Sequence, residues 1–295
     1  VDAIIFDIRD NGGGSLSDVV SIGGYFIGKG PIVQVKDRSG NVNQLNDTDP
    51  NVVYDGPLAV MVNENSASAS EIFAAAMQDY GRAVILGSTS THGKGTVQQT
   101  FNLDDYIQNS TEPFGQINIT TQKFYRINGG STQLKGVTPD ITLPDAFAMM
   151  PYGEHELDYP LAWDQINKAD YNTVSKTYNL SDIISNSQKR IANNSAFNLI
   201  SEEEKYYADT YNSSLISLNY DDYYAKQINQ KQEQDKFDDI SSDTTLTKVY
   251  NLQADLSTVN SDTVRTATNK NNLQKIDKDA YLYEATQVLS DMLKK

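Results

Sequence analysis

Hydrophobic residues in the first half of the chain are arranged in two ways, as short continuous runs and at helical spacing. Short apolar runs bounded by turn residues predict buried or half-buried strands. These runs occupy residues 3–8, 31–36, 57–62, 83–86, 96–101 and 116–127. Between them, apolar residues recur at helical spacing, which predicts helices over residues 15–27 and 68–80. Strands that alternate with helices predict a layered α/β domain, in which parallel and antiparallel pairs could share a mixed sheet.

The second half of the chain has a different pattern. Glycine and proline become rare beyond about residue 155, and polar residues and tyrosine dominate. Leu282, Ala285, Leu289 and Met292 recur at helical spacing and predict an amphipathic C-terminal helix. Residues 256–278 are polar and without a clear period, which predicts a long loop or a partly disordered linker. We therefore expect an α/β core over residues 1–150 and a mainly helical extension over residues 151–295.

Composition narrows the classes of protein. The net charge of −15 is spread over both halves and argues against nucleic-acid binding, which needs a basic face. The absence of cysteine excludes disulfides, thiolate metal sites and a cysteine nucleophile. No apolar run approaches the roughly 18 residues of a membrane span. Because the chain opens on Val1 inside a strand-like run, we expect the N-terminal part of a longer protein to precede it.

The first candidate for chemistry is a serine at the start of a predicted helix. Ser68 is followed three residues later by Glu71, and the two form the sequence of a capping box. A serine at this position also faces free backbone amides and the positive end of the helix dipole, which stabilise an oxyanion. A helix cap and a nucleophile are therefore compatible roles for Ser68. Ser66 and Ser70 are alternative nucleophiles.

The second candidate is a lysine that could activate this serine. Lys94 lies in a glycine-flanked loop between two predicted strands, although most lysines are solvated surface charges. To act as a base it must be neutral, so burial must lower its pKa from about 10.4 toward about 7–8. His92 is a rival base. His155 is the only other histidine, so we expect no metal site.

The run Gly12-Gly13-Gly14 follows the first predicted strand. Such a run is compatible with a tight turn, an anion nest or a phosphate loop. It lacks the Gly-x-x-x-x-Gly-Lys-Ser/Thr pattern, so we reject a nucleotide site. Beside a nucleophile, a glycine amide would instead be a second donor to an oxyanion.

Five blocks of the chain, taken together and in order, resemble the tail-specific, or C-terminal processing, proteases, a family of serine–lysine peptidases. The blocks are residues 7–14, 66–82, 93–99, 122–133 and 135–141. The first looks like the family's strand and glycine loop. The other four are similar almost residue for residue to the branch found in the periplasm of enteric bacteria.

The resemblance implies a role for each matching residue. Ser68 would be the nucleophile, Lys94 the general base and Gln98 the residue that orients the lysine. The amides of Gly14 and Ala69 would form the oxyanion hole. No metal or cofactor is implied, and the implied fold is a crotonase-like layered peptidase core followed by a helical C-terminal domain.

The resemblance also implies partners and a location. The family places a PDZ domain and a helical region ahead of the catalytic core, and neither is visible in this sequence. Its members select protein substrates by apolar C-terminal residues, read largely by the PDZ domain. The resemblance therefore implies a periplasmic protease, with an adaptor protein and peripheral association with the inner membrane as further expectations.

Two other classes remain open from the sequence. A non-catalytic binding or scaffold module could have the same fold without peptidase activity. A crotonase-like acyl-CoA enzyme would share the layout of the core. The combination of Ser68, Lys94 and Gln98 favours the peptidase over both.

Overall fold

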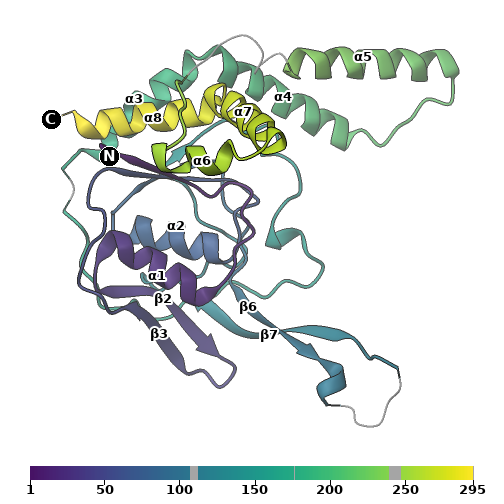
Figure 1. Cartoon of the computed structure of the whole chain (residues 1–295). Helices are drawn as coiled ribbons and strands as arrows, with labels where there is room; N and C mark the ends of the chain where they lie inside the picture. Colours follow the sequence, from purple (N-terminus) through teal and green to yellow (C-terminus); the bar gives the residue numbers. More distant parts are fainter. Residues whose placement is uncertain (107–111, 176, 239–246, 295) are drawn as a thin grey trace. The chain divides into compact units, whose positions relative to one another are not determined.

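The computed structural model of the chain describes residues 1–106, 112–175, 177–238 and 247–294 (Figure 1). Within these limits the chain forms two compact units. The first combines residues 1–142 with residues 151–179, and the second combines residues 143–150 with residues 180–294. Each unit is described by itself below.

A four-stranded parallel sheet runs through the first unit in the order β1-β4-β5-β8. Its strands are β1 (Ile4–Asp7), β4 (Leu58–Val62), β5 (Val84–Gly87) and β8 (Ile141–Thr142). All residues of β4 and β5 are buried. This burial explains why these strands are apolar runs without alternation, as expected for a parallel sheet covered on both faces.

The second sheet of this unit is antiparallel, in the order β3-β2-β7-β6. Its strands are β2 (Gly30–Asp37), β3 (Val42–Asp47), β6 (Thr96–Asn102) and β7 (Gln116–Tyr125). Parallel and antiparallel pairs are therefore kept in separate sheets, and the described residues form no mixed sheet. All six predicted strands are present, with ends that shift by no more than two residues.

Two helices, α1 (Leu16–Ile27) and α2 (Ala69–Asp79), pack side by side in the first unit (Figure 1). Phe6 of β1 contacts Phe26 of α1 and Phe73 of α2, with ring centroids 6.1 and 4.6 Å apart. Residues 69–77 of α2 are all buried. The helix that begins after Ser68 is therefore fixed in the core.

The second unit contains helices, which confirms the prediction of a mainly helical extension. They are α3 (Leu180–Ala192), α4 (Ser195–Asn212), α5 (Tyr220–Asp238), α6 (Leu256–Val259), α7 (Thr263–Asp277) and α8 (Ala280–Leu293). The carboxylate of Glu284 on α8 accepts hydrogen bonds from Ser187 and Arg190 of α3 at 2.7 Å each. Because Glu284 is buried, these bonds join the two helices as well as satisfying the charge. The described helices of both units include none long and apolar enough to cross a membrane.

The loop predicted over residues 256–278 is wrong, because α6 and α7 occupy most of that range. The Asp262 side chain accepts a hydrogen bond from the Arg265 amide at 2.8 Å and so caps α7. The helix has no buried residue and is polar on every side. A helix of this kind has no apolar stripe, so a search for hydrophobic periodicity cannot find it.

Candidate active site

The backbone of Ser68 has an unusual conformation at the turn between β4 and α2. Its φ is 56° and its ψ is −113°, in the half of φ space that residues with a Cβ rarely adopt. Such a conformation costs on the order of 1–3 kcal/mol and persists only where the surrounding structure imposes it. The Ser68 amide donates to the Glu71 carboxylate at 2.9 Å, whereas the Ser68 hydroxyl makes no cap hydrogen bond. The hydroxyl is therefore available for chemistry.

The structure separates Ser68 from the two neighbouring serines. Ser66 is fully buried, and its hydroxyl donates to the carbonyl oxygen of Ile8 at 2.7 Å. Ser70 is also buried, and its hydroxyl donates to the carbonyl oxygen of Asn11 at 2.9 Å. Ser68 is half-buried. Of the three candidates, it alone combines access to solvent with a hydroxyl that has no structural hydrogen bond.

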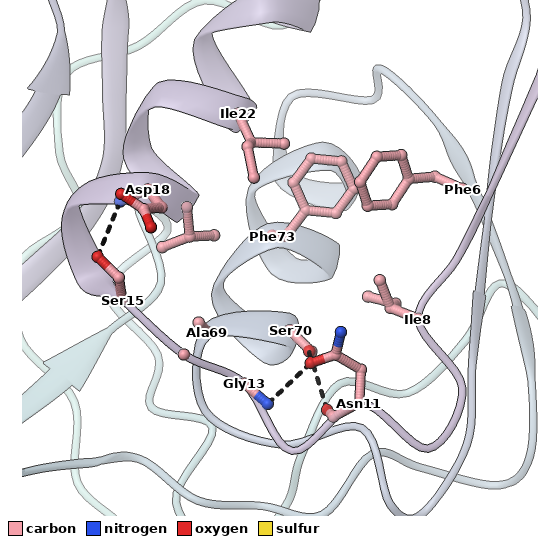
Figure 2. Close-up of a pocket in the computed structure, with 12 residues that line it drawn as sticks. Phe6, Ile8, Asn11, Gly13, Ser15, Asp18, Ile22, Ala69, Ser70 and Phe73 are labelled. Carbon is pink, nitrogen blue, oxygen red and sulfur yellow. Dashed lines mark hydrogen bonds between the residues drawn. The ribbon is translucent and has the colours of Figure 1, made fainter. Parts of the chain in front are cut away.

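Asn11 holds the glycine loop against the serine turn (Figure 2). Its side-chain oxygen accepts a hydrogen bond from the Gly13 amide at 2.9 Å, and its carbonyl oxygen accepts one from the Ala67 amide at 3.0 Å. A Cβ on Gly13 would lie only 2.9 Å from the Cβ of Ser68. With its φ of 98°, this position therefore needs glycine for both space and conformation.

Gly14 and Ala69, the predicted oxyanion donors, line one pocket. Figure 2 labels Ala69 in its wall. Neither amide donates a hydrogen bond to another residue of the described chain. The amide of Gly13, by contrast, is engaged by Asn11. These facts leave the Gly14 and Ala69 amides free for an oxyanion, although their role stays a prediction.

The pocket encloses about 230 Å³ beside the serine turn. Apolar side chains make up most of its wall, namely Phe6, Ile8, Val19, Ile22 and Phe73 (Figure 2). Ser15 and Asp18, at the N-terminus of α1, also line it, and the Ser15 hydroxyl accepts a hydrogen bond from the Asp18 amide at 3.3 Å. A pocket of this character favours an apolar side chain over a charged one.

Glu71 connects the serine turn to the loop of residues 91–95, which we call the lysine loop. One carboxylate oxygen accepts hydrogen bonds from the Thr91 hydroxyl at 2.6 Å and the Gly93 amide at 2.7 Å. The other accepts from the amides of Ser68 and Lys94, each at 2.9 Å. The amide nitrogens of Ser68 and Lys94 are therefore no more than twice that distance apart. The two residues predicted to react are brought together by one buried side chain.

The environment of Glu71 also changes its acidity. Burial raises the pKa of Glu71 to about 7, because a buried carboxylate loses its hydration. The hydrogen bonds from Thr91, Gly93, Ser68 and Lys94 act in the opposite direction, since each favours the charged form. All four donors point at the carboxylate, so a proton on either oxygen would displace one of them.

The lysine loop is also held by Gln133 and Leu134. The Gly95 amide donates to the side-chain oxygen of Gln133 at 2.8 Å, and the Leu134 amide donates to the carbonyl oxygen of Gly93 at 2.8 Å. The Lys94 side chain is half-buried. Its backbone is therefore fixed while its side chain keeps access to the solvent side of the site.

Gln98 lies on β6, four residues after Lys94, and is exposed. It pairs with Thr120 of β7, immediately after an irregularity in the pairing between Val97 and Gln98. Its proposed role in orienting Lys94 stays a prediction.

The two histidines occupy separate environments. The His92 amide donates to the carbonyl oxygen of Ser66 at 3.0 Å, and its Nε2 lies 3.7 Å from a carboxylate oxygen of Glu154. His155 is more exposed, and its Nε2 lies 3.3 Å from Glu156. In the part of the chain that the structure describes, no group of three or more His, Cys, Asp or Glu residues could hold a metal ion.

Sequence reasoning missed several residues that build the site. It treated Glu71 only as a partner in the capping box, and it gave no role to Asn11, Gln133 or Glu154. For Glu71 a signal existed, since a capping-box glutamate must lie beside the Ser68 amide. For the others, the contacts join segments that are far apart in the sequence.

Comparison with known families defines the class of protein. Residues 1–143 match Peptidase family S41, and residues 147–294 match the C-terminal domain of tail specific protease. The α/β core with its half-buried, strained serine and the helical extension are thus parts of a peptidase. The chain belongs to the tail-specific, or C-terminal processing, protease family, which confirms the resemblance drawn from the sequence.

Individual relatives agree with this family. The tail-specific protease of Haemophilus influenzae is 44% identical over 223 residues, which cover 74% of this chain and 32% of that protein. The chloroplastic carboxyl-terminal-processing peptidase 2 of Arabidopsis thaliana is 37% identical over 149 residues, or 50% of this chain and 27% of that protein. The chain thus spans about a third or less of the length of these relatives.

One solved structure that the chain resembles is a photosystem II D1 C-terminal processing protease. It is 31% identical, with a TM-score of 0.42, and the likeness covers 48% of this chain and 35% of that protein.

We predict that Glu71→Gln changes how stability depends on pH. Because the folded-state pKa of Glu71 is about 7 and the unfolded value about 4.5, folding takes up a proton between these values. The contribution of Glu71 to the free energy of unfolding therefore falls as the pH rises through this window, by up to about 3 kcal/mol at about 1.4 kcal/mol per pKa unit. The variant should lack this dependence.

Denaturant unfolding at pH 5 and pH 8, followed by the fluorescence of Trp163, the single tryptophan, measures this difference. The stability advantage of the wild type over Glu71→Gln should shrink at the higher pH. Glu156→Gln, at a half-exposed carboxylate, is the control and should follow the wild type. An advantage that stays constant or grows with pH would contradict the raised pKa.

Proposed function

We propose that this chain is the catalytic part of a serine endopeptidase, with Ser68 as nucleophile and Lys94 as general base. The observation that carries the proposal is the pair of hydrogen bonds to one oxygen of Glu71, which bring the Ser68 and Lys94 backbones together. The strained backbone of Ser68 supports it further, since strain of this kind is retained mainly at functional sites.

The reaction is an acyl transfer in two stages. Neutral Lys94 takes the proton of Ser68 as the serine oxygen attacks a peptide carbonyl carbon, and the amides of Gly14 and Ala69 hold the oxyanion. The protonated lysine then gives its proton to the departing amine. Water attacks the acyl-enzyme with Lys94 again as the base. Gln98 orients the lysine amine, and none of these steps uses a metal or a cofactor.

The substrates we propose are proteins selected by apolar C-terminal tails. The apolar pocket beside Ala69 and Gly14 supports a preference for apolar side chains next to the cleaved bond. Selection of the tail itself belongs to a PDZ domain, and with it we propose a periplasmic location, an adaptor protein and peripheral association with the inner membrane. These last proposals rest on the family alone.

A non-catalytic binding module of the same fold is the second candidate. The half-buried position of Ser68 is compatible with ligand binding alone. A pure binding function, however, gives no reason to hold a serine at a φ of 56° with its hydroxyl without a structural partner.

We predict that Ser68→Ala and Lys94→Ala each abolish activity, while His92→Ala retains most of it. The backbone bonds of His92 survive that substitution, and its side chain takes no part in the proposed reaction. Activity is measured in two ways, as cleavage of an unstructured protein with an apolar C-terminus and as labelling by a fluorophosphonate. Labelling of Ser68 does not depend on recognition of a tail.

Cleavage and labelling together distinguish the peptidase from the binding module, and Lys94 from His92 as the base. A wild-type chain that is neither labelled nor active supports the binding module over the peptidase. Full activity in Lys94→Ala together with loss in His92→Ala would make His92 the base.

We predict that Ile22→Phe alters the preference for the residue on the acyl side of the cleaved bond. The larger ring fills part of the pocket, so cleavage after leucine or phenylalanine should fall by about tenfold or more relative to cleavage after alanine. Peptide libraries analysed by mass spectrometry measure the preference. Tyr25→Phe, at an exposed position on the same helix, is the control. An unchanged preference would mean that the pocket does not receive this side chain.

A further inference from the structure

Residues 153–169 belong to the first compact unit, which contains Ser68 and Lys94 and which we call the catalytic unit. They nevertheless fall outside the match to the peptidase family, which ends at residue 143. The Trp163 indole nitrogen donates to the carbonyl oxygen of Ser131 at 2.9 Å. Further along, the Ile166 amide donates to the carbonyl oxygen of Gly129 at 2.9 Å, and the Ala169 amide to that of Ile127 at 2.8 Å. The segment is thus bonded at several points to the chain that follows β7, within the first compact unit.

Glu154 is the residue of this segment that reaches the lysine loop. Its amide donates to the carbonyl oxygen of His92 at 2.9 Å. One of its carboxylate oxygens accepts from the side-chain nitrogen of Gln133 at 3.1 Å, and the side-chain oxygen of Gln133 accepts from the Gly95 amide at 2.8 Å. Both residues are buried: Gln133 has no exposed surface, and 8% of the surface of Glu154 is exposed.

The approach of this segment to the loop also depends on Gly153. Its φ is 104°, and a Cβ at this position would lie 2.9 Å from the carbonyl oxygen of His92. A residue with a side chain would have to push the segment away from the loop. The contact between Glu154 and the loop is therefore close and built into the backbone.

The peptide groups on either side of Lys94 are consequently held by two buried side chains. The Lys94 amide donates to Glu71, and the Gly95 amide donates to Gln133. Gln133 can accept the hydrogen bond from the Gly95 amide only while its side-chain oxygen, and not its side-chain nitrogen, faces the lysine loop. Glu154 fixes that orientation, because its carboxylate accepts only from the nitrogen end of the Gln133 side chain.

We propose that Glu154 is a positioning residue for Lys94, acting through the side-chain amide of Gln133 and the backbone of His92. Residues 153–169 are then a working part of the catalytic unit. The proposal rests on the proposed function, in which Lys94 is the base. Without an acceptor at position 154, the buried side-chain nitrogen of Gln133 has no hydrogen-bond partner. Alternatively, the side-chain amide of Gln133 rotates by half a turn, so that its NH₂ group faces the Gly95 N–H and the bond to Gly95 is lost.

The test compares the rate constant and the apparent affinity for acylation of Ser68 by a fluorophosphonate in the whole chain. Glu154→Ala should lower the maximal acylation rate by about tenfold or more, with the apparent affinity unchanged, since a displacement of about 1 Å in a catalytic group can cost about a hundredfold. Glu154→Gln keeps an oxygen acceptor and should restore the rate to within about threefold of the wild type. Gln133→Ala should match Glu154→Ala, and the double variant should be no slower than either single variant.

Glu156→Ala is the matched control, because Glu156 lies on the same short turn, η2 (Glu154–Glu156), and pairs with His155. It should acylate like the wild type. Amide hydrogen exchange supplies a second readout, in which residues 93–99 should exchange faster in Glu154→Ala and normally in Glu154→Gln.

Two results would overturn the proposal. One is an unchanged acylation rate in Glu154→Ala, with or without a lower melting temperature, which would make the residue merely structural. The other is normal hydrogen exchange of the lysine loop in that variant. A wild-type chain that is never labelled overturns the proposed function instead, and hydrogen exchange then still decides whether Glu154 holds the loop.

Discussion

One buried carboxylate determines the geometry of this site. Glu71 receives four hydrogen bonds, from the serine turn at one oxygen and from the lysine loop at both. A carboxylate removed from water is stable only when such donors replace its hydration, so these bonds are a condition of folding. The requirement that Glu71 be satisfied therefore also fixes the distance between the Ser68 and Lys94 backbones.

The packing of the surrounding core offsets the unfavourable free energy of the strained Ser68 backbone. Residues 69–77 of α2 are buried, and Phe73 packs on Phe6 and Phe26. Burying one such side chain contributes about 1.5–3 kcal/mol, which is comparable to the strain at one residue. The helix cannot rotate to relax Ser68 without exposing this surface. Packing of the helix thus holds the Ser68 backbone in its strained conformation.

The sequence predicted those parts of the fold and site whose signal is local. Strand β4 is a continuous apolar run and helix α2 has apolar residues at helical spacing, whereas β3 is mostly exposed and polar, and β8 has only two residues. Ser68 and Lys94 stood out because of their immediate neighbours. Glu154 and Gln133 lie 21 residues apart and interact only after folding. Nothing in their local sequence distinguishes them from ordinary polar residues.

The boundary between sequence families does not coincide with the boundary between structural units. The peptidase match ends at residue 143, and the next family begins at residue 147, yet residues 151–179 belong to the same compact unit as Ser68 and Lys94. A lysine loop between glycines has little rigidity of its own, because glycine restricts the backbone least. It must therefore be held by side chains from elsewhere. Glu71 holds the Thr91 hydroxyl and the Gly93 and Lys94 amides, but not the Gly95 amide. The Gly95 amide therefore needs a separate partner. In this chain the partner is Gln133, whose side chain is in turn bonded to Glu154 in the segment beyond the peptidase match.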